Sequence, residues 1–316
     1  MHREDVLTSA WASRQWRALG SPSELLVYGP NAEAVADDAV AEIERLEACW
    51  SRFRSDSELS ELNRSQARWF PVSPTLWDAL HKARWAFTAT EGLFDPTVHD
   101  RLVDLGYDRT FRDMAATGTE ELSASMAPIG FDAVVFDDKA HAIQLPDDRA
   151  IDLGGIGKGL AADLVTAFAI ANGATSVCLG LGGDIRVRGP GPDADAAWNI
   201  QVQHPVDDRV LGSFPLIDEA LVQSTTLFRR WERSGRSVHH LIDPRTGQPS
   251  ETDLVGAVVT GVDAWLAEVV AKSAILLGST AGLALLIRSE LDGWLLHSDG
   301  AVTATAAVEK DLETFA

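Results

Sequence analysis

The spacing of the strand-like runs constrains the fold of this chain more than any other feature. Apolar or alternating runs at 176–181, 185–189 and 198–203 stand close enough together to pair through hairpins. A regular doubly wound sheet would instead place a helical crossover between successive strands. Because helical and strand-like segments interleave irregularly, the sequence predicts an α+β fold with mixed, largely antiparallel sheets and packed helices.

Four segments carry the apolar spacing of three and four residues that is typical of an amphipathic helix. The clearest is 31–53, whose apolar stripe comprises Val35, Ala39, Ile43, Leu46 and Trp50. Three further helices are predicted at 75–92, 160–173 and 264–278, and each of them is closed by a glycine. These helices provide the layer that we expect to cover the sheet.

Composition and charge exclude several classes of function. An apolar fraction of 46% with 23% charged residues is ordinary for a globular protein. A net charge of −20 repels phosphate backbones, so we expect no nucleic-acid partner, although a small nucleotide site can be locally positive. No apolar run approaches the roughly 20 residues that cross a membrane, and the first residues lack an export-signal pattern. We therefore expect a cytoplasmic protein with no membrane partner, in which Cys49 and Cys178 are buried thiols.

The segment IDLGGIGKGLAADLV, 151–165, has the pattern of a phosphate cradle. A strand ends at Asp152, four glycines follow, Lys158 adds a cation, and a helix begins. Glycines let a ligand approach the backbone, and a helix N-terminus offers free N–H groups. The spacing fits neither GxxxxGK[ST], because Gly159 follows the lysine, nor GxGxxG, because Leu160 holds the last position, so a nicotinamide-dependent oxidoreductase is disfavoured. A strand-to-helix connection without a ligand remains the alternative.

Two other segments combine polar and apolar residues in an unusual way. In HHLIDPRTGQP, 239–249, two histidines precede a tight turn. In AWLAEVVAKSAILLG, 264–278, Glu268 and Lys272 lie four residues apart and so share a helix face. A surface ion pair explains that spacing, but the apolar neighbours indicate partial burial, which is rare for such residues unless they serve a purpose.

Seven motifs taken together resemble the FAD:protein FMN transferases, the ApbE family. In chain order they are SRFRSDSELSELN, GLFDPTV, IDLGGIGKGLAAD, LGGDIRV, WNIQVQHP, HHLIDPRTGQP and AEVVAKSAILLG. The resemblance spans about residues 12–300. It implies an ApbE-like domain over 12–305, either as one unit or as two closely packed subdomains, with terminal extensions at 1–11 and 306–316.

The resemblance also implies an activity. Enzymes of this family bind FAD with a divalent metal, usually Mg²⁺. They transfer the FMN moiety to a threonine or serine hydroxyl of a target flavoprotein and release AMP. For this chain the resemblance therefore implies an enzyme whose partners are FAD and such a flavoprotein.

Individual site residues follow from the same resemblance. His240 matches the histidine that serves as general base, whereas His239 has no match and is expected to be structural. Gly155, through its carbonyl oxygen, and Glu268 match metal ligands. The positions expected to bind FAD are Leu19, Phe53, Leu93, Phe94, Asp95, Asp152, Lys158 and Lys272.

The chain departs from the family at the metal-binding helix. Glu268 and Lys272 stand where the family has an aspartate and a threonine, and a protonated lysine cannot ligate a metal. Three interpretations follow: the ammonium of Lys272 replaces the metal, the metal keeps other ligands, or transfer is lost. In the last case the protein only binds or hydrolyses FAD. Gln223-Ser224-Thr225, in place of the family's Thr-Ser-Gly, is a second departure.

Overall fold

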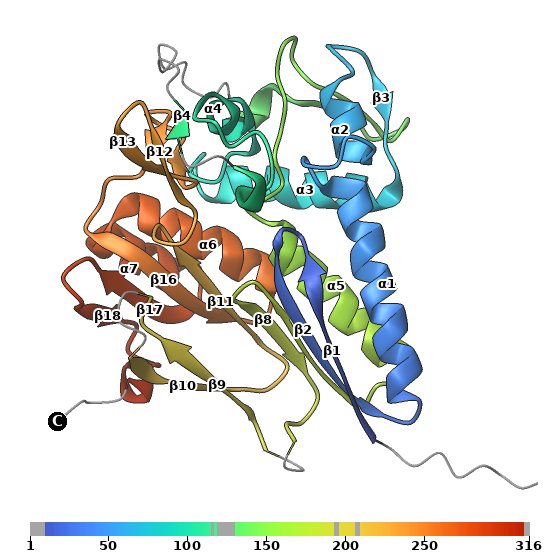
Figure 1. Ribbon diagram of the computed structural model, residues 1–316, viewed down its shortest axis with the longest axis vertical. Helices are drawn as coiled ribbons and strands as arrows, with labels where there is room; N and C mark the ends of the chain where they lie inside the picture. Colours follow the sequence, from blue (N-terminus) through green and yellow to red (C-terminus); the bar gives the residue numbers. More distant parts are fainter. Residues whose placement is uncertain (1–9, 115–116, 119–129, 193–195, 206–208, 313–316) are drawn as a thin grey trace, which may run out of the picture.

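An antiparallel sheet of eight strands forms the centre of the molecule (Figure 1). The computed structural model describes residues 10–114, 117–118, 130–192, 196–205 and 209–312. The strand order is β1-β2-β7-β8-β11-β16-β17-β18, and each neighbouring pair is antiparallel. The strands are β1 (Ala10–Ala18), β2 (Ser21–Gly29), β7 (Ser176–Leu181), β8 (Asp184–Arg188), β11 (Ala220–Thr225), β16 (Leu254–Gly261), β17 (Asp292–His297) and β18 (Val302–Ala304). This arrangement confirms the predicted fold class.

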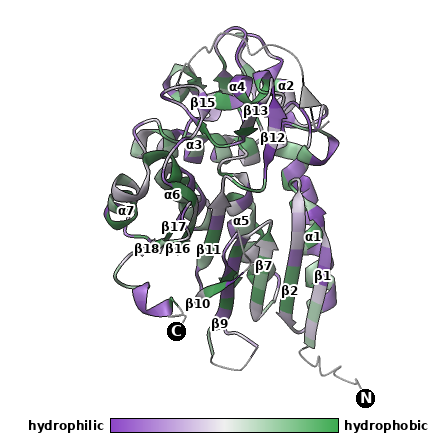
Figure 2. Cartoon of the chain, turned by 60° about the vertical axis from the view of Figure 1, so that its left-hand side comes forward, coloured by the Kyte–Doolittle hydropathy of each residue, from purple (hydrophilic) through white to green (hydrophobic). Residues whose placement is uncertain are grey.

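Four helices cover one face of this sheet. They are α1 (Ala32–Trp50), α5 (Gly157–Ala171), α6 (Ala264–Leu277) and α7 (Ser279–Arg288). In Figure 2 the ribbon of α1 alternates between hydrophilic and hydrophobic colours, whereas that of α6 is mostly hydrophobic. Of the 14 residues of α6, most are buried, including Glu268. The sequence predicted α1, α5 and α6 but not α7, which begins directly after the glycine that ends α6.

The other face of the sheet is covered by a hairpin and by the end of the described chain. Strands β9 (Trp198–Gln203) and β10 (Val210–Leu216) form the hairpin, and the Phe214 ring lies 4.3 Å from the Trp294 ring of β17. Trp294 Nε1 donates a hydrogen bond to the carbonyl oxygen of Val308 at 3.1 Å. The short helix η4 (Glu309–Asp311) follows. Part of the segment 306–316, assigned above to a terminal extension, therefore packs on the sheet; the domain boundaries remain a prediction.

A second group of helices and short strands gathers at one end of the sheet, at the top of Figure 1. Its helices are α2 (Glu58–Asn63), α3 (Pro74–Ala89) and α4 (His99–Asp104), with the short turns η1 (Pro96–Val98), η2 (Phe111–Asp113) and η3 (Phe131–Ala133). Its strands are β3 (Phe70–Pro71), β4 (Thr117–Gly118), β5 (Val135–Asp137), β6 (Ala142–Gln144), β12 (Arg230–Arg233), β13 (Arg236–His239), β14 (Ile242–Asp243) and β15 (Gln248–Pro249). Residues from this group and from the adjacent ends of the sheet strands line two neighbouring cavities.

Helix α5 begins three residues before the predicted start, and Gly159 in its first turn packs against the start of α6. A Cβ atom on Gly159 would lie 2.4 Å from the carbonyl oxygen of Ala264, so only glycine permits this crossing. The carboxylate of Asp163 on α5 accepts hydrogen bonds from the backbone N–H groups of Ala264 at 3.1 Å and Trp265 at 3.0 Å. It thereby satisfies donors at the start of α6. The two contacts fix the first turn of α5 against α6.

The predicted thiols are free, but they are buried to different degrees. Cys49 is buried and Cys178 is half-buried. Burial raises the pKa of both thiols to about 12. Of the helices in the described part of the chain, none combines the length and the apolar character that crossing a membrane requires.

Candidate functional site

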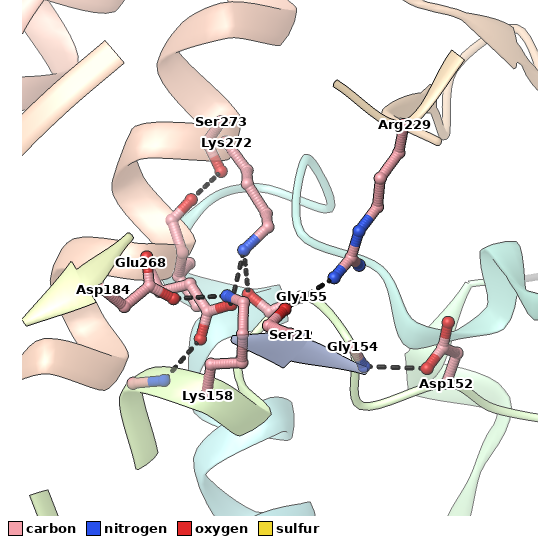
Figure 3. Close-up of polar contacts among 12 residues, drawn as sticks. Ser21, Asp152, Gly154, Gly155, Lys158, Asp184, Arg229, Glu268, Lys272 and Ser273 are labelled. Atoms are coloured by element: carbon pink, nitrogen blue, oxygen red, sulfur yellow. Dashed lines mark hydrogen bonds and ion pairs between the residues drawn. The ribbon is translucent and has the colours of Figure 1, made fainter. Parts of the chain in front are cut away.

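Four charged side chains from α5, β8 and α6 meet in one cluster (Figure 3). The Lys158 ammonium donates hydrogen bonds to Asp184 Oδ2 and, at 2.7 Å, to Glu268 Oε1. The Lys272 ammonium donates to the same Glu268 oxygen at 2.6 Å and to the carbonyl oxygen of Gly155 at 3.2 Å. We call Lys158, Asp184, Glu268 and Lys272 the charged cluster. The α5–α6 crossing at Gly159 and Asp163 brings its members together.

The two lysines of the charged cluster are compensated unequally. Burial disfavours ionised Glu268, but attraction to Lys158 and Lys272 outweighs it and lowers the glutamate pKa to about 2. Burial also disfavours charged Lys158, yet Asp184 and Glu268 together raise its pKa above the ordinary value. For Lys272 burial dominates, repulsion from Lys158 adds to it, and the pKa falls. Lys272 is therefore the cation with less carboxylate compensation.

Two cavities meet beside the charged cluster. The larger has a volume of about 1020 Å³, and both polar and apolar residues of β1, β2, β11 and the two glycine-rich turns line it. The smaller, of about 100 Å³, has aromatic and aliphatic walls. Four residues line both cavities, and we call them the junction: Gly154, Arg229, His240 and Lys272. The junction is the point at which a long, partly apolar ligand would pass from one cavity to the other.

His240 follows β13, lines the junction and has one unpaired ring nitrogen. Its Nδ1 is buried and makes no hydrogen bond within the described residues. Burial, followed by the positive charges of Arg229 and Lys272, holds its pKa well below 6.5. The imidazole is thus neutral near pH 7 and available as a base. Its neighbour His239 is buried in a structural role, with Nε2 3.0 Å from the carbonyl oxygen of Ser250.

The smaller cavity is walled by rings and by an internal ion pair. Arg52 pairs with Asp152 at 2.9 Å, and its guanidinium lies 4.1 Å from the centre of the Phe53 ring and 4.6 Å from that of Tyr107. The other Asp152 oxygen accepts a hydrogen bond from the Gly154 N–H at 2.7 Å. Both oxygens of Asp152 therefore have partners within the fold, and the carboxylate fixes the turn that carries Gly154.

The FDPT segment contributes packing and a turn cap to the same cavity. Leu93 and Phe94 are buried there, and a Cβ atom on Gly155 would lie 2.8 Å from the Phe94 ring. The Asp95 carboxylate accepts hydrogen bonds from the Thr97 N–H at 2.8 Å and the Thr97 hydroxyl at 2.7 Å. Burial raises the Asp95 pKa. Asp95 thus caps a turn as well as lining the cavity.

Most of the sequence-predicted site residues lie in this region, with one exception. Phe53, Leu93, Phe94, Asp95, Asp152, Gly155, Lys158, His240 and Lys272 line one or both cavities, and Glu268 lies directly behind the lysines. Leu19 lines neither of the two described cavities. It occupies the β1–β2 turn with φ 51°, packs against the core, and donates its N–H to Glu47 at 3.1 Å. Its neighbours Gly20 and Ser21 line the larger cavity instead.

Sequence patterns did not predict Arg229, Arg52, Tyr107 or the role of Asp184. The Arg229 guanidinium enters the junction and donates to the Ser21 hydroxyl at 3.0 Å (Figure 3). Ser21 is 208 positions away in the sequence, so no local sequence pattern could predict the contact. A signal did exist for Asp184, because it directly follows the glycine pair Gly182-Gly183 in the motif LGGDIRV.

The donor set does not fit the divalent metal that the resemblance implies. The Gly155 carbonyl and Glu268 both accept hydrogen bonds from the Lys272 ammonium, and the second Glu268 oxygen accepts one from the Gly159 N–H at 2.8 Å. Within the described ranges, no group of three or more His, Cys, Asp or Glu side chains is placed to hold a metal ion. A protonated lysine offers no lone pair and repels a cation. These residues therefore hold an ammonium where a metal was expected.

Comparisons with known proteins identify the same family as the order of the seven motifs does. The sequence model of the ApbE family matches residues 19–294. A FAD:protein FMN transferase of Treponema pallidum is 28% identical over 323 residues, covering 94% of this chain and 87% of that protein. One of Vibrio cholerae is 28% identical over 238 residues, covering 74% of this chain and 71% of that protein. The crystal structure of an ApbE protein from Thermotoga maritima matches with a TM-score of 0.87 at 23% identity, over 96% of this chain and 100% of that one. That match confirms the predicted ApbE-like fold.

Proposed function

This chain belongs to the ApbE family, and from that premise we propose that it transfers the FMN moiety of FAD to a threonine or serine hydroxyl of a target flavoprotein. The observation that carries the proposal is the junction. A neutral base, His240, and two cationic side chains, Arg229 and Lys272, line both a large open cavity and a small aromatic one. FAD is a ligand of matching character, because a planar ring system and a nucleoside flank its diphosphate.

The proposed reaction exchanges one phosphoester linkage for another. The acceptor hydroxyl oxygen attacks the phosphorus of the FMN half and forms a new P–O bond. The bond from that phosphorus to the bridging oxygen breaks, and the bridging oxygen leaves with AMP. His240 takes the hydroxyl proton, a role supported by its lowered pKa and its unpaired Nδ1.

The cations of the junction stabilise the charge that this reaction develops. Negative charge grows on the non-bridging oxygens and on the oxygen that leaves with AMP. Lys272 and Arg229 lie on the wall beside His240, where fixed positive groups are most effective for such charge. Lys158 contributes less, because it lies between the carboxylates of Asp184 and Glu268. No step of this proposal needs a group beyond these side chains and the two substrates.

A protein that only binds or hydrolyses FAD is the alternative from the sequence analysis. The comparisons do not favour it, because the similar curated proteins are named transferases. Hydrolysis would place water where the acceptor hydroxyl stands and would release FMN together with AMP. The two reactions therefore differ in whether the flavin becomes attached to protein.

The test is a transfer assay on the purified chain with FAD and a target flavoprotein domain that carries an acceptor threonine. We expect the mass of one FMN unit to appear on the target and an equal amount of AMP in solution. His240→Ala should retain FAD and lose transfer by about 10²–10⁴-fold, as expected for removal of a general base. His141→Asn is the matched control, since His141 is exposed in the β5–β6 turn outside both cavities. Intact FAD with no AMP, or free FMN with an unmodified target, would contradict the proposal.

The acceptor and the location are parts of the same proposal. We propose a flavoprotein with a threonine or serine acceptor as the partner, and the cytoplasm as the location. The free thiols of Cys49 and Cys178 suit a reducing compartment. Cell fractionation with detection of the flavinylated target tests both points.

A further inference from the structure

We infer that the ammonium of Lys272 takes the place of a divalent metal ion in this protein, so that FAD binding and FMN transfer proceed without one. The inference rests on the proposed function for its substrate. It selects one of the three interpretations that the sequence left open at the departure from the family, and it concerns residues of this chain alone.

The first support is the position of the ammonium. Lys272 Nζ bridges Glu268 Oε1 at 2.6 Å and the Gly155 carbonyl oxygen at 3.2 Å, the two groups that the resemblance assigns to a metal (Figure 3). A magnesium ion would need those oxygens at about 2.0–2.1 Å together with further oxygen ligands. It could reach them only by displacing the ammonium from the same point.

The second support is the rigidity of the groups that hold the ammonium. Glu268 is completely buried on α6, and its second oxygen is held by the Gly159 N–H. The Gly155 backbone is packed against the Phe94 ring so closely that an added Cβ would clash. Because both acceptors are fixed, Lys272 has one position that satisfies two of its three N–H groups. Among the described residues the Lys272 ammonium has no third acceptor, so its remaining N–H is open to a ligand at the junction.

The third support is the charge balance of the site. Lys158 is held by two carboxylates, Asp184 and Glu268, whereas Lys272 has one carboxylate, Glu268, and a neutral carbonyl. Lys272 also lines both cavities, and Arg229 lies on the same junction. A diphosphate that bridges the cavities would therefore meet two side-chain cations. This pair supplies positive charge of the kind that a bound divalent ion would otherwise provide.

Metal binding itself is the most direct test, and it needs no activity. Mn²⁺ is titrated into the wild-type protein with FAD and followed by electron paramagnetic resonance, with the same titration of FAD alone as the baseline. We expect the wild type to bind no Mn²⁺ beyond that baseline. We expect Lys272→Thr, and more strongly Glu268→Asp combined with Lys272→Thr, to bind one Mn²⁺ per chain. Binding of one Mn²⁺ per chain by the wild type, above the baseline of FAD alone, would overturn the inference.

FAD affinity in the presence of chelator is the second measurement. Fluorescence titration should give the same FAD dissociation constant for the wild type with EDTA and with Mg²⁺. Lys272→Met removes the ammonium and keeps the apolar stem, so it should weaken FAD binding by at least tenfold in EDTA. Lys139→Met is the matched control, because Lys139 is exposed in the β5–β6 turn, and its FAD affinity should equal that of the wild type. A tenfold or larger loss of wild-type affinity in EDTA would contradict the inference.

The outcomes separate this inference from the proposed function. If no acceptor is flavinylated under any condition, the transferase proposal fails, while the Mn²⁺ and FAD titrations still decide the role of Lys272. If transfer occurs with Mg²⁺ and stops in EDTA, the transferase proposal stands and the inference fails. Both wild-type titrations are independent of how well any Lys272 variant folds.

Discussion

Two helices on the same face of the sheet each carry an ion pair that spans about one helical turn, and the two pairs have equal lengths. On α1, Arg45 lies 2.6 Å from Glu42; on α6, Lys272 lies 2.6 Å from Glu268. The α1 side chains are 53% and 21% exposed, whereas those of α6 are 15% and 0% exposed. Geometry alone therefore does not distinguish a pair on the surface from a pair in the site.

The difference between the two pairs comes from the residues around them. Helix α1 has a single apolar stripe, so its charges face solvent on the other side. Helix α6 is apolar on nearly all sides, so its charges are enclosed wherever they point. An enclosed pair costs desolvation energy, and we expect it to persist only where it does something that a surface pair cannot do. In this protein it holds an ammonium at the junction.

The largest effect should come from replacing the glutamate of each pair by leucine. Glu268→Leu leaves the ammonium groups of Lys158 and Lys272 without their shared carboxylate, and breaking a buried pair in this way costs about 3–5 kcal/mol. Glu42→Leu on α1 should cost no more than about 1 kcal/mol, because that pair is partly solvated. Urea denaturation of both variants measures the difference. Equal losses would show that enclosure does not separate the two helices.

A second contrast concerns added volume at the helix surfaces. Gly159→Ala places a Cβ 2.4 Å from the Ala264 carbonyl, so α5 must move away from α6 at a cost of about 1–3 kcal/mol. It should also weaken FAD binding, because Lys158 and the Glu268 contact lie at that crossing. Ala41→Val, at an exposed position of α1, should change stability by less than about 0.5 kcal/mol. A stable Gly159→Ala variant with wild-type FAD affinity would show that the crossing does not position the cluster.

Enclosure should also be visible in the pH dependence of transfer. The pKa of His240 is lowered by burial and then by Arg229 and Lys272, so the base stays neutral when the pH falls through 6.5. The pKa of Lys272 is lowered as well, so its positive charge is lost below the ordinary lysine value of 10.5. The profile of kcat/KM, which reports the free enzyme, should therefore decline on the acid side only below pH 6.5 and on the alkaline side before pH 10.5.

Two variants test whether Lys272 causes the alkaline decline of kcat/KM. Lys272→Met should flatten the alkaline limb, since no ammonium is left there to titrate. Arg45→Ala, a cation removed from the exposed pair of α1, should leave both limbs in place. An acid limb centred at or above pH 6.5 in the wild type would contradict the role given to burial around His240.

The sequence was sufficient for the layers of the fold and less so for the contacts between them. Hairpin-spaced strands and the stripe of α1 predicted the antiparallel sheet and its covering helix. The start of α5 was missed because glycine has low helix propensity, whereas the packing of Gly159 on Ala264 requires a glycine in the first turn of the helix. A tertiary contact of this kind produces no periodic pattern of apolar residues in the sequence.

In the candidate site too, the sequence predicted local motifs but not the contacts between distant segments. The motifs HHLIDPRTGQP and IDLGGIGKGLAAD were enough to predict that His240 and Lys158 belong to the candidate site, because glycines and turns constrain the local backbone. Arg229 lies in the site only because the chain between β11 and β12 returns to β2, where it reaches Ser21. Leu19 shows the reverse case, since it was expected to bind FAD but packs on the core while the next two residues line the larger cavity.

The smallest effect, and the closest test of the comparison, is the salt dependence of the exposed pair. Arg45→Ala on α1 should lower the free energy of unfolding by about 0.2–1 kcal/mol at low ionic strength, because it removes the Glu42 pair and a hydrogen bond to Thr75. Its electrostatic part should fade as salt rises to about 1 M, where the screening length is near 3 Å. The loss caused by Glu268→Leu should change little over the same range, because neither solvent nor ions reach a fully buried carboxylate. Urea titrations of both variants at two salt concentrations decide the matter. If the Glu268 effect were screened as strongly as the Arg45 effect, the Glu268 carboxylate would be open to solvent, and enclosure would not distinguish the α6 pair from the α1 pair.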